Sequence, residues 1–205
     1  MLDIGAGNGG VSVALANDHV SEVTAVDIVP NYDLLRLRRE LGSPVRQVVG
    51  NGHRLPFPAS SFDVVVCLDT IEHVPQPGIM GGEIMRVLAP GGECMITTPA
   101  RVRILFAPDP HYGIRFLALL PNALARLWVL HVARPTVLSA EGIPTVVYEV
   151  EHLFWHVREI ARLFPGPKRV ESLFNNPLPY RSRLANAFWL RFRNFVWDRI
   201  VIIKE

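Results

Sequence analysis

Apolar and polar positions alternate along the chain, up to residue 99, in short blocks that suit strands and helices in turn. The expected strands span residues 1–4, 22–28, 45–49, 62–68 and 93–97, and the expected helices span 11–17, 32–41 and 82–88. The run at 62–68 is mostly apolar and β-branched, which is typical of a central strand in a parallel sheet. This alternation predicts βαβ units and a Rossmann-like, doubly wound α/β fold.

The pattern changes after Pro99. Residues 100–144 are rich in Pro and Leu without regular alternation, and they predict an insertion over the carboxyl edge of the sheet. Alternation then resumes, with helices expected at 157–164 and 184–196 and strands at 168–174 and 199–204. With these last two strands the expected sheet has seven strands.

The composition suits one α/β domain over residues 1–205, because 49% of the residues are apolar and can bury a substantial core. We expect a core at residues 1–99, a helical, substrate-side insertion or lid at 100–150 and a C-terminal completion of the sheet at 151–205. The formal net charge of +2 argues against a surface dedicated to nucleic acid, so no nucleic-acid partner is expected.

Two cysteines, Cys67 and Cys94, fall inside apolar runs. We expect them to be reduced core residues rather than a disulfide or a metal pair. The chain does not open with a basic stretch followed by an apolar one, so it shows no signal peptide and a cytoplasmic location is expected.

The most hydrophobic stretch, residues 114–133, is interrupted by Pro121 and by basic residues, which argues against a transmembrane helix. We expect it either to contact a membrane surface peripherally or to line an apolar substrate pocket. Basic residues also concentrate between 180 and 199, where a solvated helix face is favoured over contact with an anionic headgroup or phosphorylated substrate.

The clearest chemical signal is a glycine-rich turn between a strand and a helix, LDIGAGNGG at residues 2–10. Glycines let the backbone approach a ligand closely, and the helix that follows offers free N–H groups. The spacing of Gly5, Gly7 and Gly10, with Asp27 about 20 residues on, also fits the dinucleotide-binding fingerprint. A tight structural turn without a ligand is the third interpretation.

Later features distinguish these ligands. Asp3 places a carboxylate beside the turn, which suits the ammonium of an amino-acid ligand and would repel a pyrophosphate. After the third strand, residues 50–57 (GNGHRLPF) offer polar groups for an adenine edge and an apolar wall at 55–57. The fourth strand ends in LDTIEHV at 68–74, where open α/β sheets bind their ligands.

Taken together, these motifs resemble those of class I S-adenosylmethionine-dependent methyltransferases of the type 11 group. The matching segments are LDIGAGNG at 2–9, LPFPASSFDVVV at 55–66, IEHV at 71–74 and RVLAPGG at 86–92. The resemblance is dense over residues 1–99 and looser beyond them. It implies a mostly parallel seven-stranded sheet with an antiparallel final strand. It also implies an N-terminally truncated domain, because the chain opens inside the first strand.

The resemblance implies S-adenosylmethionine as the cofactor and, position by position, a set of contacts to it. These are Asp3, Gly5 and Gly7 around the methionine part, Asp27 on both ribose hydroxyls, Asn51 and Gly52 at the adenine, and Leu68 beside the sulfonium. Asn51 stands where the family usually has Asp, but its carbonyl oxygen can still accept a hydrogen bond from the adenine amino group.

Methyl transfer from a sulfonium is an in-line displacement in which orientation and desolvation can supply much of the rate. A general base is needed only if the acceptor is protonated at neutral pH. His73 is the first candidate base, with a cofactor-positioning or helix-capping role as an equal alternative, and His111 in the motif PDPHYG is the second. His152 and His156 have metal-ligand spacing, but they lack further ligands and predict a structural helix face and no metal site.

The favoured function is S-adenosylmethionine-dependent methyl transfer to a small-molecule, glycan or lipid-linked acceptor. The insertion's apolar content and modest basic character favour an apolar or anionic acceptor. Residues 108–121 are similar to a methyltransferase subgroup associated with cell-envelope glycan or lipid biosynthesis. The alternatives are a non-catalytic, methyltransferase-like binding protein and a nicotinamide-dependent oxidoreductase, which only the glycine spacing and Asp27 support.

Overall fold

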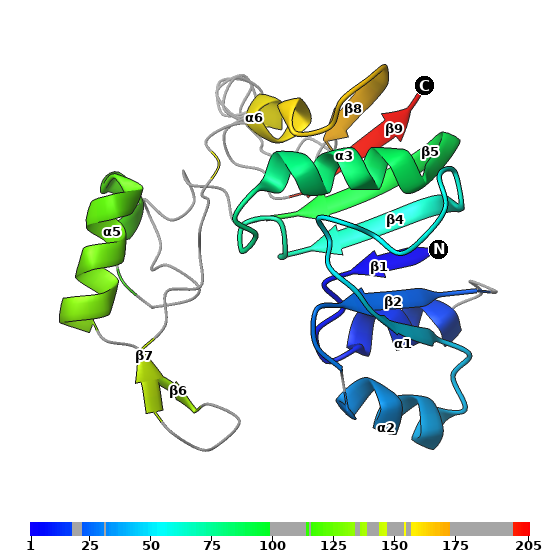
Figure 1. Cartoon of the computed structure of the whole chain (residues 1–205), viewed down its shortest axis with the longest axis horizontal. Helices are drawn as coiled ribbons and strands as arrows, with labels where there is room; N and C mark the ends of the chain where they lie inside the picture. Colours follow the sequence, from blue (N-terminus) through cyan, green and yellow to red (C-terminus); the bar gives the residue numbers. More distant parts are fainter. Residues whose placement is uncertain are drawn as a thin grey trace, which may run out of the picture.

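The computed structural model describes residues 1–17, 22–30, 32–98, 114, 116–133, 136–138, 144–146, 154, 157–172 and 199–205. In this part of the chain, strands far apart in the sequence form one seven-stranded sheet (Figure 1). Its strands are β1 (Leu2–Ile4), β2 (Thr24–Asp27), β3 (Arg46–Val49), β4 (Phe62–Leu68), β5 (Leu88–Thr97), β8 (Lys168–Ser172) and β9 (Arg199–Lys204).

The strand order is β3-β2-β1-β4-β5-β9-β8. Strands β1 to β5 run parallel, β9 pairs antiparallel with β5, and β8 pairs antiparallel with β9. The prediction of a doubly wound, mostly parallel seven-stranded sheet with an antiparallel final strand is confirmed. The order changes direction between β1 and β4, and in such sheets a ligand crevice opens at the carboxyl ends of the strands at that point.

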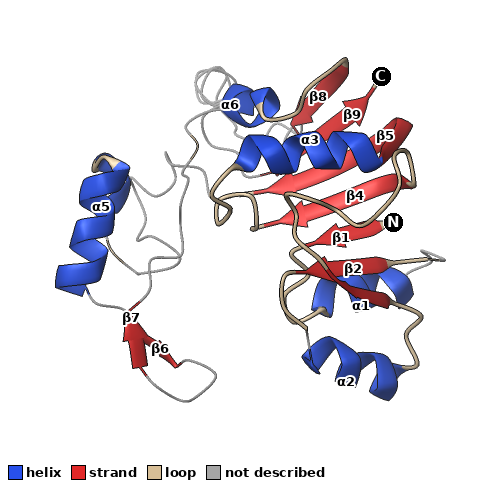
Figure 2. Ribbon diagram, viewed as in Figure 1, coloured by secondary structure: helices blue, strands red, loops and turns tan. Residues whose placement is uncertain are grey.

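Helices cover both faces of the sheet (Figure 2). They are α1 (Gly10–Asn17) and α2 (Tyr32–Leu41) on one face, and α3 (Pro77–Val87) and α6 (Val157–Arg162) on the other. Ala25 of β2 packs in one buried cluster with Val13 of α1 and Leu34 of α2. Ile4 of β1 belongs to a second cluster with Ile84 of α3. Alternate strand residues thus face opposite helix layers, as a doubly wound fold requires.

The boundary between α3 and β5 differs from the prediction. The helix begins at Pro77, five residues before the predicted start at 82, because proline at the first helical turn lacks only an N–H that would have no partner there. The PGG segment at 90–92 was expected to separate the helix from the next strand, but it lies inside β5. Phe62 pairs with Leu88 and Val64 with Glu93, so residues 89–92 form a bulge inside β5.

The insertion after β5 contains the helix that was expected and a hairpin that was not. Its elements are the 3₁₀ turn η1 (Leu117–Leu119), α5 (Asn122–Trp128), the π-helix η2 (Val129–Ala133) and the antiparallel strands β6 (Thr136–Leu138) and β7 (Pro144–Val146). They lie beyond the carboxyl ends of the parallel strands (Figure 1). Leu117, Ala125 and Val129 form a small core of their own. The helix predicted at 184–196 lies outside the described residues.

Cys67 on β4 and Cys94 on β5 are both buried and free, which confirms their prediction as core residues. Burial raises the pKa of the Cys94 thiol, and both thiols stay protonated in the core. None of the described helices is long and apolar enough to cross a membrane.

Candidate functional site

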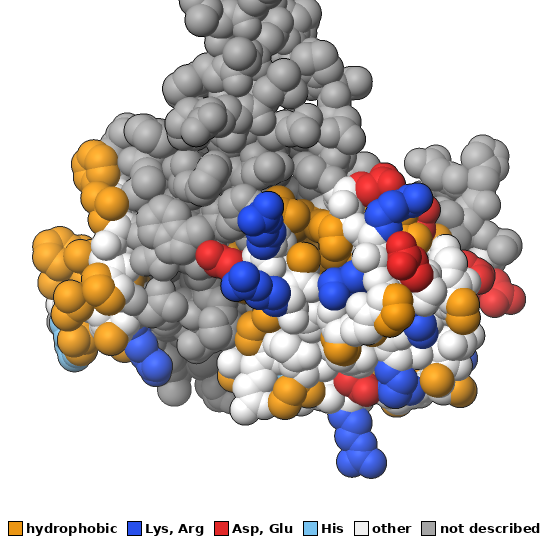
Figure 3. All heavy atoms as spheres, turned by 90° about the horizontal axis from the view of Figure 1, so that it is seen from above, with side chains coloured by type: hydrophobic (Ala, Val, Ile, Leu, Met, Phe, Trp, Pro, Cys, Tyr) orange, Lys and Arg blue, Asp and Glu red, His pale blue; other side chains and the backbone are white. Residues whose placement is uncertain are grey.

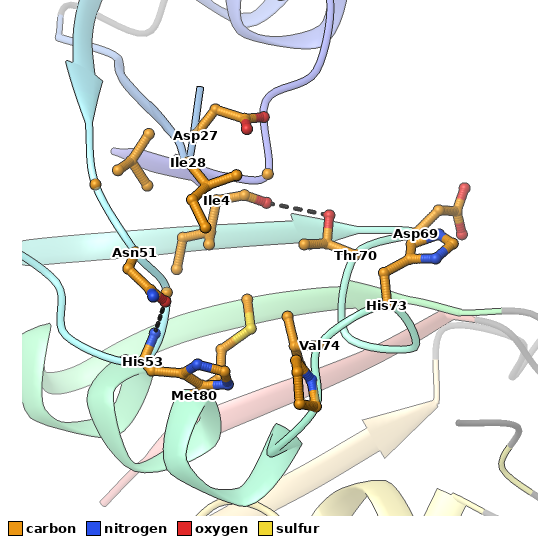
Figure 4. Close-up of a pocket in the computed structure, with 15 residues that line it drawn as sticks. Ile4, Asp27, Ile28, Asn51, His53, Asp69, Thr70, His73, Val74 and Met80 are labelled. Carbon is orange, nitrogen blue, oxygen red and sulfur yellow. Dashed lines mark hydrogen bonds between the residues drawn. The ribbon is translucent and has the colours of Figure 1, made fainter. Parts of the chain in front are cut away.

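Two adjoining cavities lie at the carboxyl edge of the sheet. The first has a volume of about 470 Å³, and Figure 4 shows the side chains around it, with Asp27 and Asn51 on one side and Asp69 and His73 on the other. The second has a volume of about 570 Å³. Gly5 and Asp69 line both cavities, so the two form one continuous candidate site at the predicted crevice.

All seven residues that the resemblance assigned to a cofactor line these cavities. Gly5, Asp27, Asn51 and Gly52 line the first, and Asp3, Gly5, Gly7 and Leu68 line the second. They come from four separate strands or the turns that follow them, and only the parallel packing of the sheet brings them together. Their shared location supports a common ligand.

The glycine-rich turn after β1 is held in place by the neighbouring strand. The Gly5 N–H donates to Val26 O at 2.9 Å. Gly5 has a φ of +73°, and a Cβ at this position would lie 2.3 Å from Thr70 Oγ1, so no side chain fits. At Gly7 a Cβ would meet only Gly5 O at 4.0 Å, so this side of the turn is open to a ligand.

Asp27 ends β2 and joins the turn to the first cavity. Its Oδ2 accepts a hydrogen bond from the Gly7 N–H at 2.9 Å, and Oδ1 accepts one from the Val29 N–H at 3.4 Å. A carboxylate has about four lone-pair positions, so both oxygens can still accept hydrogen bonds from a ligand. This geometry suits a pair of ribose hydroxyls.

Asp3 is more deeply buried than the sequence suggested. Only 3% of the residue is exposed, and its Oδ2 accepts a hydrogen bond from Ser12 Oγ of α1 at 2.5 Å. Burial raises the pKa of Asp3, and the nearby Asp27 charge acts in the same direction, while the Ser12 bond opposes them. Asp3 therefore ties α1 to the turn while it lines the second cavity.

Asp69, directly after β4, is a site residue that the sequence analysis did not select. Its φ is +46°, which is uncommon for a residue with a side chain. Thr97 at the end of β5 holds it: Thr97 Oγ1 donates to Asp69 Oδ1 and accepts from the Asp69 N–H, both at 3.0 Å. Both residues line the second cavity. The available signal was that each closes a central strand of the predicted sheet.

Asn51 and His53 form the far wall of the first cavity (Figure 4). Asn51 Oδ1 accepts a hydrogen bond from the His53 N–H at 2.9 Å and keeps a second lone pair. His53 Nε2 is buried and has no hydrogen-bond partner among the described residues. A polar group of a bound ligand could satisfy this nitrogen, which makes His53 a further candidate contact.

The apolar wall of this cavity is not the one predicted. Residues 55–57 are absent from its lining, which instead includes Ile4, Ile28 and Met80. Leu55 belongs to the core, and Phe57 packs edge-on against Phe62 with ring centroids 5.0 Å apart. An apolar segment beside a cavity and an apolar segment in a core have the same sequence pattern.

Arg86 fixes that segment in the core. Its guanidinium donates to Phe57 O at 2.8 Å and to Leu55 O at 3.0 Å. It also forms a bidentate pair with Glu83, with both N···O distances at 2.7 Å. Glu83 in turn accepts from the Leu55 N–H at 2.8 Å. The LPF and RVLAPGG motifs are thus joined by one cluster of hydrogen bonds around Arg86 and Glu83.

His73 lines the first cavity with 32% of its side chain exposed, whereas the adjacent Glu72 is fully buried. His73 Nε2 lies 3.9 Å from Glu72 Oε1. Gln76 occupies the N-cap position of α3 without a side-chain cap hydrogen bond, so the helix-capping alternative for His73 stays a prediction. Its other two roles, base or cofactor positioning, also stay predictions. His111, the second candidate base, lies outside the described residues.

Glu72 has an unusual environment. Neither of its carboxylate oxygens has a hydrogen-bond partner among the described residues. Burial raises the pKa of Glu72 from 4.5 to about 7, Asp69 adds to this rise, and His73 opposes it. Glu72 thus changes its charge near neutral pH.

The charge around the cavities selects among ligands. Asp3, Asp27 and Asp69 line them, and among the described residues no Lys or Arg does. Such a site attracts a cation and repels a pyrophosphate. The carboxylates, the open turn at Gly7 and the apolar wall fit S-adenosylmethionine, which carries a sulfonium and an ammonium. The described residues hold no group of three or more His, Cys, Asp or Glu suited to a metal, and His152 and His156 lie outside them.

Comparison with known proteins agrees with this geometry. Residues 2–96 match the family described as a methyltransferase domain. A 2-methyl-6-phytyl-1,4-hydroquinone methyltransferase of Synechocystis sp. is 36% identical over 95 residues, 45% of this chain and 29% of that protein. A ubiquinone biosynthesis O-methyltransferase of Xylella fastidiosa is 32% identical over 111 residues, 52% of this chain and 44% of that protein. These matches span less than half the length of either relative.

The likeness in structure extends further along the chain. The YcgJ protein of Bacillus subtilis superposes with a TM-score of 0.60 at 20% identity, over 100% of this chain and 91% of that one. At this identity the likeness concerns the fold alone. Residues 2–96 are thus similar in sequence to a methyltransferase domain, and the described sheet has the fold of the YcgJ protein.

Proposed function

We propose that this protein is an enzyme that transfers a methyl group from S-adenosylmethionine to an apolar small-molecule acceptor. The observation that carries the proposal is the continuous pair of cavities, which Asp3, Asp27 and Asp69 line and to which the described part of the chain contributes no Lys or Arg. Two relatives that match this core are a 2-methyl-6-phytyl-1,4-hydroquinone methyltransferase and a ubiquinone biosynthesis O-methyltransferase. These names support an acceptor with an apolar part.

The proposed roles follow from position. Asp27 would bind the ribose hydroxyls, Asn51 and Gly52 the adenine edge, and Asp3, Gly5 and Gly7 the methionine part, with Leu68 beside the sulfonium. S-adenosylmethionine, when bound, supplies an activated methyl group. The residues of this chain would orient it and exclude water from the acceptor, which contributes rate without a covalent intermediate on the protein.

Compartment and partners belong to the same proposal. Free, buried Cys67 and Cys94 support a reducing, cytoplasmic environment. The small net charge and the acidic site support a small-molecule partner over nucleic acid. Peripheral membrane contact through residues 114–133 would bring the enzyme to acceptors whose apolar part lies in a bilayer.

Calorimetric titration with S-adenosylmethionine and, separately, with NAD tests the cofactor assignment. We expect saturable binding of S-adenosylmethionine alone. Asp27→Ala should raise its Kd by about 100-fold or more, because it removes two hydrogen bonds to a charged group and each contributes about 1.5–3 kcal/mol. Asp33→Ala is the matched control, since Asp33 is an exposed aspartate on α2 that pairs with Arg36 at 3.6 Å.

Binding of NAD alone would support the oxidoreductase alternative, and an unchanged Kd in Asp27→Ala would refute the assigned ribose contact. Binding of neither ligand would favour the non-catalytic alternative.

His73 is the proposed general base if the acceptor is a hydroxyl. We expect His73→Asn to lower kcat by about 10²- to 10⁴-fold with a hydroxyl acceptor, because a positioned base contributes that much. The affinity for S-adenosylmethionine, measured by calorimetry on the same variant, should change little. If affinity falls and kcat at saturation does not, His73 positions the cofactor instead.

A further inference from the structure

The insertion presents an apolar surface that the cofactor site does not use. Six large apolar side chains between residues 116 and 132 are each between 48% and 61% exposed, namely Phe116, Leu119, Leu124, Leu127, Trp128 and Val132. We call them the apolar face. Figure 3 shows hydrophobic side chains gathered over this end of the molecule, apart from the mixed, charged surface of the sheet domain. Contiguous exposed apolar surface of this kind marks an interaction site.

The helix geometry separates this face from the insertion's own core. Leu124, Leu127 and Trp128 stand at i, i+3 and i+4, which places them on one side of α5. Ala125 and Val129 point the other way and are buried in the small core with Leu117. The apolar face therefore remains exposed after the insertion has packed, and it faces outward rather than into either described cavity.

The charges around the face indicate what binds it. Between Asp109 and Glu141 the sequence contains no acidic residue, and it carries Arg115, Arg126 and Arg134. Arg126 and His131 are exposed on the same helical segment as the apolar face. A second copy of the chain meeting this face would bring two such basic segments together, with no acid between residues 110 and 140 to compensate. An anionic lipid surface compensates the charge and covers the apolar side chains at once.

We propose that the apolar face docks this protein on an anionic membrane surface, with Trp128 at the level of the headgroups and with Arg126, on another side of α5, attracted by the negative surface potential. Aromatic and basic side chains are enriched at that depth of a bilayer. The inference deepens the proposed function by naming the surface and the lipid chemistry. The inference rests on the proposed apolar acceptor only for the reason why the protein would bind a membrane. None of the six residues of the apolar face lines the candidate cofactor site.

Vesicle co-sedimentation of the full chain tests the proposal. We expect binding to phosphatidylcholine vesicles that contain about one third phosphatidylglycerol, and weaker binding to phosphatidylcholine alone or at high salt. The double variant Leu124→Gln/Leu127→Gln should lower the partition coefficient by about tenfold or more, because two exposed leucines no longer enter the apolar layer. Leu35→Gln/Leu41→Gln on α2 replaces two other exposed leucines and should bind as the unaltered chain does.

Three further measurements keep the test decisive. Arg126→Glu should weaken binding to the anionic vesicles, whereas Arg39→Glu on α2 should not. Trp128→Phe keeps an apolar ring and should still bind, but the blue shift of tryptophan fluorescence on adding vesicles should shrink. Calorimetric titration with S-adenosylmethionine should be unchanged in Leu124→Gln/Leu127→Gln, which separates a failure of this proposal from a failure of the cofactor site.

Equal vesicle binding by the unaltered chain and the Leu124→Gln/Leu127→Gln variant would overturn the proposal. So would a dimer, detected by light scattering in the absence of vesicle binding, that this variant dissociates. In that case the face joins copies of the chain.

Discussion

Gly5 and Asp69 show how single residues shape the candidate site. Each closes a strand of the parallel sheet and each lines both cavities. A Cβ at Gly5 would lie 2.3 Å from Thr70 Oγ1, so only a glycine leaves room for the Thr70 side chain. Asp69, which precedes Thr70, has a φ of +46°. The two turns can therefore cross closely, which places a carboxylate next to the glycine-rich turn. Thr97 stabilises the unusual backbone at Asp69 with two hydrogen bonds.

Glu72 leads to a prediction about stability and pH. Its pKa is raised from 4.5 to about 7 in the fold, so between these values the folded state binds a proton that the unfolded state has lost. Stability should therefore fall as pH rises through this window, by about 3 kcal/mol in total, because each pKa unit corresponds to about 1.4 kcal/mol. Urea unfolding of Glu72→Gln at a series of pH values should show this slope removed.

Glu40→Gln is the control for this measurement, since Glu40 is a largely exposed glutamate on α2. It should leave the slope in place. A Glu72→Gln protein with the same loss of stability between pH 4.5 and 7 would show that another group is responsible.

At the scale of elements, Arg86 joins α3 to the loop before β4. Arg86→Met should lower the free energy of unfolding by about 2–4 kcal/mol, because it leaves the Glu83 carboxylate and two backbone carbonyls without their charged donor. Arg169→Met is the matched control, because Arg169 pairs with Glu171 at 2.9 Å on the surface of β8, where such pairs contribute about 1 kcal/mol or less. Urea unfolding of both variants checks the difference, and equal losses would contradict it.

The elements of the sheet follow closely from the sequence, whereas their ends depend on neighbours. Strands β1 to β4 were predicted nearly at their observed bounds, because buried parallel strands need continuous apolar runs. The start of α3 and the bulge in β5 were not predicted. α3 passes so close to Leu163 O that only a glycine fits at position 81, and Gly92 of the PGG segment lies against Asp63 O of β4. Both contacts are with partners distant in the sequence.

At the scale of the whole molecule, the parallel sheet forms the cavities and the insertion carries the apolar face. The sheet brings the ends of β1, β2, β4 and β5 to one edge, where two cavities form. The insertion lies beyond that edge (Figure 1), and the side chains of its apolar face are exposed. A cofactor site and a lipid-facing surface on the same side of the molecule would suit an enzyme whose acceptor has an apolar tail.

The sequence by itself determined the fold class and the mostly parallel sheet, and its resemblance to methyltransferases implied the seven residues proposed to bind the cofactor. Their signals are local, since a glycine-rich turn and an acid at a strand end have the same meaning wherever the strand is placed. Only the tertiary structure decided that Leu55 and Phe57 pack with the core, that Asp69 and Thr97 line the site and that Glu72 is buried without a hydrogen-bond partner among the described residues. Burial and pairing depend on which distant segments pack together, and an apolar pattern alone does not specify the surface against which it packs.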